Sequence, residues 1–170
     1  MKVRVFISVL IISLAFWPLA FAAADDSSWS CQLKLTGENL GGVSEAAISV
    51  GICSEDKLFP APPAPPEYSA QISLMDMESG ESYFKDLRKS GERVYKWVIA
   101  VDPHGNIGSP FTTRNAILTW NPSCLASGTY QLFKGTESQA TLLVPDMKAL
   151  ESFEIWGSSE IQYLTLQYTP

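Results

Sequence analysis

Short segments in which apolar and polar residues alternate recur along the chain from residue 29 onward, separated by glycine, proline, asparagine and aspartate turns. The first has Cys31, Leu33 and Leu35 on one face, the period of two expected of a half-buried strand. Val94–Val101 is the strongest strand candidate because it is rich in β-branched and aromatic residues. The other predicted strands are 30–35, 46–52, 68–75, 82–87, 116–120, 129–133, 140–144, 152–156 and 161–168. Only Asp146–Ser152 shows even a weak helical pattern, so we predict an all-β, antiparallel sandwich of roughly 8–10 short strands.

The first residues have the pattern of a secretory signal peptide. Lys2 and Arg4 precede an apolar run that extends to Leu19, and the small-x-small sequence Ala20-Phe21-Ala22 follows it. This run is too short, and its flanks are wrong, for a membrane span. We predict a signal peptide over residues 1–22, with cleavage as late as residue 24, and a single β-sandwich domain over 23–170. The expected location is secreted, cell-surface or periplasmic.

Charge narrows the class of partner. The formal net charge is −6, and it falls to about −8 without the signal, which carries two basic residues and no acid. Nucleic acid and anionic lipid both reward a basic surface, so neither is expected as a partner. No second apolar run reaches membrane length, so we predict no membrane span in the mature chain.

Three cysteines, Cys31, Cys53 and Cys124, lie in a chain expected to enter an oxidising compartment. A hairpin centred near Gly41-Gly42 would place residues whose numbers sum to about 84 opposite each other, and Cys31 and Cys53 satisfy that sum. We therefore take them as the disulfide candidates, with Cys124 as a free or intermolecular thiol. Pairing of Cys53 with Cys124 is the main rival, and sequence alone does not choose between them.

The chain offers few groups for catalysis. His104 is the only histidine, and its Pro-His-Gly context favours an exposed turn over a catalytic base. No nucleophile, zinc or phosphate-binding motif is present, so we predict no enzyme activity, no catalytic residue, no metal site and no cofactor. The acidic segment 76–81 has oxygen ligands for calcium, but its spacing matches no defined calcium loop, and a solvated hairpin tip explains it equally well.

Aromatic residues and a proline run are the remaining candidates for a binding surface. Trp29, near the predicted mature N-terminus, and Trp156, beside Gly157, are the candidate binding aromatics, whereas Trp97 and Trp120 lie within apolar strands typical of a core. Five prolines between residues 60 and 66 enforce an extended conformation. We interpret that run as a stiff connection along an edge or across one end of the fold.

Several segments together resemble a known kind of domain. They are Val50-Gly51, the proline run 60–66, Asp86-Leu87-Arg88, the strand around Trp97, and Leu118-Thr119-Trp120-Asn121-Pro122 with Gly128-Thr129-Tyr130-Gln131-Leu132 behind it. This spacing resembles immunoglobulin-like β-sandwich domains that recur in bacterial secreted and cell-surface multidomain proteins. The resemblance implies an architecture, and it implies no catalytic residues.

The leading hypothesis is a non-enzymatic, immunoglobulin-like domain that binds another protein or serves as a structural subunit of a bacterial surface or periplasmic assembly. The alternative is a carbohydrate-binding module that holds polysaccharide on exposed aromatic side chains. A small hydrolase built around His104 ranks last.

Overall fold

A computed structural model describes residues 28–39, 42–63, 69–103, 115–136, 140–156 and 161–170. The predicted signal peptide, His104 and residues 64–66 of the proline run lie outside these residues. The strands are β1 (Trp29–Asn39), β2 (Gly42–Cys53), β3 (Lys57–Pro60), β4 (Gln71–Met75), β5 (Ser82–Lys89), β6 (Tyr95–Asp102), β7 (Ala116–Trp120), β8 (Thr129–Lys134), β9 (Thr141–Val144), β10 (Ser152–Ile155) and β11 (Gln162–Thr169). A 3-10 turn, η1 (Pro122–Cys124), follows β7. The prediction of an all-β chain is confirmed.

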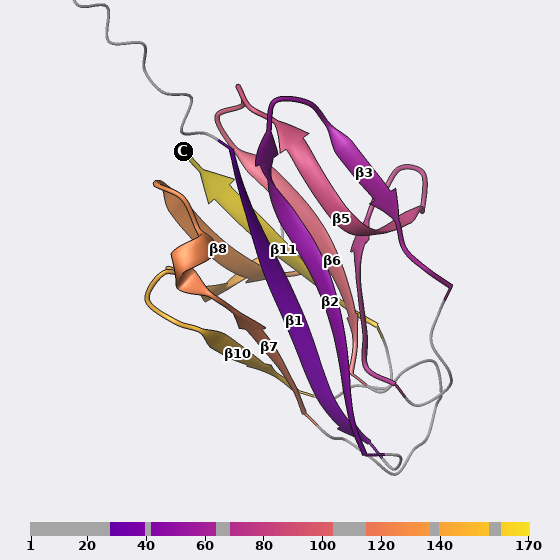
Figure 1. The fold of residues 1–170 in the computed structure, drawn as a ribbon. Helices are drawn as coiled ribbons and strands as arrows, with labels where there is room; N and C mark the ends of the chain where they lie inside the picture. The colour runs from indigo at the N-terminus through magenta and orange to yellow at the C-terminus, as the bar shows by residue number, and fades with distance from the viewer. Residues whose placement is uncertain (1–27, 40–41, 64–68, 104–114, 137–139, 157–160) are drawn as a thin grey trace, which may run out of the picture.

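The strands form one mixed sheet that curls into a nearly closed, barrel-like body (Figure 1). Its order is β10-β7-β1-β2-β5-β4-β6-β11-β8-β9. Strand β3 pairs with the edge of β5 opposite to the one that β2 and β4 share. Most neighbours are antiparallel, but β2 and β5 are parallel. The prediction of a purely antiparallel sandwich is therefore not confirmed. The cause is topological. Strands β3 and β4 lie between β2 and β5 along the chain, so β5 can begin at the same end of the sheet as β2 and run parallel to it.

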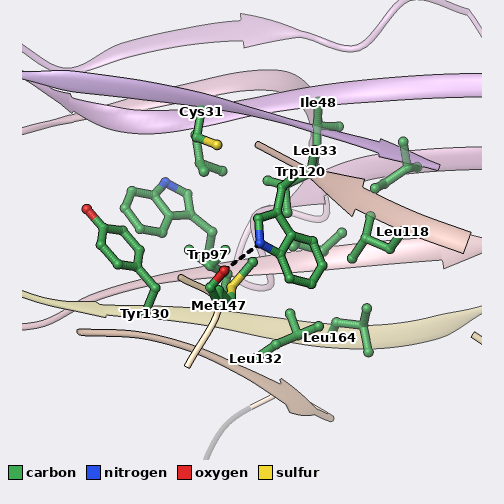
Figure 2. Packing of buried hydrophobic residues seen from close by; sticks show 14 of the residues in the cluster. Cys31, Leu33, Ile48, Trp97, Leu118, Trp120, Tyr130, Leu132, Met147 and Leu164 are labelled. Atoms are coloured by element: carbon green, nitrogen blue, oxygen red, sulfur yellow. Dashed lines mark hydrogen bonds between the residues drawn. The ribbon is translucent and has the colours of Figure 1, made fainter. Parts of the chain in front are cut away.

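The core lies between the two walls of this body. Strand β6 shows why: Tyr95, Trp97, Ile99 and Val101 are each at most 3% exposed and alternate with residues of the other face. Figure 2 shows Leu33 of β1 and Leu118 of β7 on one side of the core, with Leu132 of β8 and Leu164 of β11 on the other. Side chains from strands far apart in sequence therefore share one apolar interior.

Segments outside the sheet help to close the body. Trp120 donates its indole N–H to the carbonyl oxygen of Met147 over 2.8 Å, and Met147 is fully buried (Figure 2). The amide of Met147 in turn donates to the carbonyl of Tyr130. Asp146–Ser152, the weak helix candidate, contains a turn in which the Asp146 carboxylate accepts the amide of Lys148. This segment thus covers the interior between β9 and β10.

Candidate functional site

Trp29 is a core residue, which corrects its prediction as an exposed binding aromatic. It is 8% exposed and makes edge-to-face contacts with Tyr130 and Tyr168 at centroid distances of 5.1 and 5.2 Å, and with Trp97 at 6.0 Å. The physical reason is register, because β1 begins at Trp29 and the inward alternation of Cys31, Leu33 and Leu35 includes it. That signal was visible in the sequence.

Tyr130, Tyr168 and Tyr95 complete this aromatic cluster, which we define as Trp29, Tyr95, Trp97, Tyr130 and Tyr168. Tyr130 and Tyr168 stack with centroids 4.5 Å apart, and Tyr95 stacks on Tyr168 at 5.8 Å. Burial, reinforced by the neighbouring Tyr168, raises the pKa of the Tyr130 phenol. The cluster is a packed part of the interior, and its residue Trp97 also borders the groove described below.

Trp156 has the exposure expected of it. It follows β10, and 71% of its surface is accessible. The Gln162 amide nitrogen donates to its backbone carbonyl over 2.6 Å, and Ile161 beside that glutamine is 53% exposed. The structure does not bring Trp156 together with Trp29, which is buried in the core. A binding role for Trp156 stays a prediction.

The cysteine pairing differs from the prediction. Cys31 is bonded to Cys124, with Cα atoms 5.2 Å apart, and Cys53 is the free thiol. In the β1–β2 hairpin Asn39 pairs with Gly42, so facing residue numbers sum to 81 rather than 84. Cys31 consequently faces Val50, and Cys53 lies beyond the end of the β1 ladder. The turn η1 places Cys124 beside β1. The disulfide therefore links β1 to the Asn121–Leu125 segment.

The acidic segment 76–81 closes the β4–β5 hairpin. The Asp76 carboxylate accepts the Glu78 amide over 2.9 Å and the Ser79 hydroxyl over 2.7 Å. Both hydrogen bonds lower the pKa of Asp76, and the one from Ser79 has the larger effect. The carboxylate of Glu81 accepts the hydroxyl of Tyr83 and thereby raises the pKa of that phenol. Within the described ranges no three metal-ligating side chains gather, here or elsewhere.

A half-open groove, not predicted from the sequence, lies beside that hairpin. Its volume is about 560 Å³, within the usual range of ligand sites. It forms where β5, which pairs with β4 only at Ser82 and Tyr83, leaves β4 and continues along β2. Its lining residues come from β3, β4, β5, β6 and β11 and from the turns that hold Asp56 and Met77. Strands β3 and β5 lie on the opposite side of the molecule from β8 and β10 (Figure 1).

An ion pair between a buried carboxylate and a partly exposed arginine lies in the groove. Arg88 donates from Nε and Nη2 to Oδ2 of Asp86 over 3.2 and 3.1 Å, and its guanidinium lies 5.3 Å from the Trp97 ring centroid. Asp86 is 8% exposed, because it lies inside the sheet between β2 and β3, facing Val50 and Leu58. The alternation of Asp86 and Arg88 places both on one face of β5. The charge of Asp86 is therefore compensated inside the protein.

Exposed apolar side chains lie on β3, β5 and the hairpin turn, and two of them, Leu58 and Met77, line the groove. Leu58 is 52% exposed, Phe59 40%, Met77 50% and Phe84 41%. Phe59 and Phe84 contact each other at 5.9 Å, and the Lys85 ammonium lies 5.4 Å from the Phe59 ring centroid. We call Leu58, Phe59, Met77 and Phe84 the corner patch. The sequence analysis missed it because Phe59-Pro60 was interpreted as the start of a proline connection, whereas Lys57–Pro60 is strand β3.

Comparison with known proteins identifies no relative. No family model, curated protein or solved structure matches this chain. Within the described residues no helix has the length and apolar character needed to cross a membrane.

Proposed function

We propose that this protein is a secreted, non-enzymatic, immunoglobulin-like domain that binds another protein in a bacterial surface or periplasmic assembly. The observation that carries the proposal is the corner patch, four large apolar side chains left 40–52% exposed on β3, β5 and the hairpin turn, of which Leu58 and Met77 line the groove. Clustered exposed apolar residues beside a cleft are typical of protein-binding surfaces, whereas single ones are ordinary. The groove and the patch together form the proposed contact surface.

Two features support a binding rather than a catalytic role. The buried carboxylate of the groove, Asp86, is held by Arg88, and Asp76 is held by its own turn. An acid or base catalyst instead needs a carboxylate free to exchange a proton near neutral pH. The immunoglobulin-like part of the proposal draws support from two facing walls around a buried tryptophan, while the parallel β2–β5 pair departs from it.

The test is capture of a partner by variants of the corner patch. The purified protein and a Leu58→Glu/Phe84→Glu variant are immobilised and exposed to the native secreted or periplasmic fraction, followed by cross-linking and mass spectrometry. We expect a stoichiometric protein cross-linked to β3 or β5, and its loss with the variant, because a charge would be buried in an apolar contact.

The matched control is Ile117→Glu. Ile117 is 47% exposed on β7, several strands away from β5 in the sheet, so the same chemical change falls outside the proposed surface. Capture should survive it. Equal capture by all three proteins, or no captured protein, contradicts the proposal.

A carbohydrate-binding role is the second candidate, and it rests on Trp156. A tryptophan with 71% of its surface accessible can stack on a sugar ring. Glycan-array binding that is lost with Trp156→Ala, and retained with Leu58→Glu/Phe84→Glu, supports this function. Silence across a broad array counts against it.

A further inference from the structure

We propose that the groove selects an extended segment of the partner protein in which a lysine or arginine is flanked by apolar residues, with Asp86 as its anchor. This inference rests on the proposed function and specifies the chemistry of its ligand. Three features of the groove carry it: the unused capacity of a buried carboxylate, an excess of acidic side chains, and apolar walls of strand length.

Asp86 retains capacity to accept hydrogen bonds. Both hydrogen bonds that Arg88 donates go to Oδ2, and no hydrogen bond from the described residues reaches Oδ1. A carboxylate offers about four lone-pair sites, so the second oxygen can accept an incoming donor. Since Asp86 is 8% exposed, a bond to a charged donor there forms away from bulk water and is strong.

The charges that line the groove favour a cationic ligand. Four carboxylates, Asp56, Asp76, Glu78 and Asp86, face two cations, Arg88 and Lys96. Arg88 is already paired with Asp86, and neither Glu78 nor Lys96 forms an ion pair within the described part of the chain. The whole chain has the same sign, with a net charge of −6. Charge complementarity therefore selects a basic segment and disfavours an acidic one.

The walls suit apolar residues on either side of that basic group. Leu58 of β3, Leu74 of β4 and Met77 of the hairpin turn line the groove. Its β5 wall runs from Tyr83 to Arg88, a length of about 16 Å at the rise of an extended strand. An extended segment of about five residues has this length. A strand or terminal tail of another protein has the extended form that suits a site of this length.

A random-peptide selection tests this inference directly. A phage-displayed heptapeptide library is panned at low ionic strength on the purified protein and, in parallel, on Asp86→Asn. We expect enrichment of peptides with lysine or arginine between apolar residues on the natural protein, and loss of that basic position on the variant. Enrichment without a basic position, or none above blank resin, overturns the inference.

Charge reversals at the exposed rim guard against a folding defect in Asp86→Asn. Glu78→Lys and Lys96→Glu change exposed side chains that line the groove, and thermal melts should show that both variants fold. By fluorescence polarisation, the selected basic peptide should bind several-fold more weakly to Glu78→Lys and several-fold more tightly to Lys96→Glu. Equal affinities for the two reversals overturn the inference.

The two proposals fail differently. If a partner is captured through the corner patch but its contacting segment is acidic or wholly apolar, the ligand inference is wrong and protein binding stands. If capture is indifferent to Leu58→Glu/Phe84→Glu, both are wrong. Binding of polysaccharide in the groove, competing with the selected peptide, also overturns both.

Discussion

The aromatic cluster and the corner patch contain similar side chains in opposite environments. In the cluster Trp29, Trp97 and Tyr130 are between 0 and 8% exposed and pack on one another at favourable ring distances. In the corner patch Phe59 and Phe84 contact each other yet remain 40 and 41% exposed. The first region gains stability from burial. The second leaves apolar surface in water, where binding can later bury it.

The disulfide belongs to the closed region. Cys31 follows Trp29 by two positions on the same face of β1, so the covalent link and the aromatic cluster lie together. At the corner, β5 is shared between β2, β3 and β4, and β3 consists of four exposed residues. Lysine and proline in β3 are features that blunt a free strand edge against unspecific pairing. The corner therefore combines these edge features with exposed apolar side chains.

The largest expected effect comes from the aromatic cluster. Trp29→Ala should lower the free energy of unfolding by about 3–5 kcal/mol, because it leaves a cavity among three packed rings. Urea denaturation measured by circular dichroism checks this. Trp156→Ala is the matched control and should change stability by less than about 0.5 kcal/mol. Equal losses would break the distinction between buried and exposed tryptophans.

The disulfide should rank next. The linked cysteines are 93 residues apart, and the chain-entropy model gives about 4–5 kcal/mol for such a loop, with measured values commonly 2–4. Cys31→Ser/Cys124→Ser should therefore lower the unfolding free energy by about 2–5 kcal/mol. Cys53→Ser should leave it nearly unchanged. Intact-mass analysis after alkylation without reductant should find one modified cysteine, Cys53, and a modified Cys124 would contradict the pairing.

The corner patch should show the reverse behaviour. Phe84→Ser removes a half-exposed ring and should lower stability by only about 1 kcal/mol or less, while it weakens partner capture. Thermal melts and the capture assay on the same sample measure both quantities. A loss as large as that of Trp29→Ala would mean that the patch is part of the core, which would remove its value as evidence for binding.

Local sequence patterns predicted most of the strands but not their partners. The alternation in Val94–Val101 predicts β6 closely, since burial on one face and β-propensity agree there. The Cys31–Cys53 pairing was wrong because a shift of three in a hairpin register changes every facing pair while leaving the pattern of each strand almost untouched. The register of the hairpin could therefore not be predicted from the pattern of either strand alone.

The candidate site was beyond sequence reasoning for a different reason. Asp86 and Arg88 sit at alternate positions, which indicates one face of a strand, yet nothing local says that this face lines a groove. The groove exists because β5 changes neighbours from β4 to β2, a non-local event. Strand β3 (Lys57–Pro60) was missed for a local reason. The prolines that follow it favour an extended connection, so the segment was interpreted as part of that connection.

The smallest expected effect is a pH dependence at the hairpin turn that borders the groove. Hydrogen bonds from Ser79 and the Glu78 amide lower the pKa of Asp76 below 3.8 in the folded protein. Between the two pKa values the unfolded chain binds more protons than the folded protein. The stabilisation that Asp76 contributes to the folded state is therefore present above about pH 4 and is lost as pH falls through the lowered pKa. Urea midpoints between about pH 2.5 and 6 should converge for the natural protein and Asp76→Ala at the acid end. Ser79→Ala, which removes the largest cause, should raise the carboxyl pKa in an NMR titration, and a pH-independent gap between the two urea curves would mean that Asp76 acts only through packing.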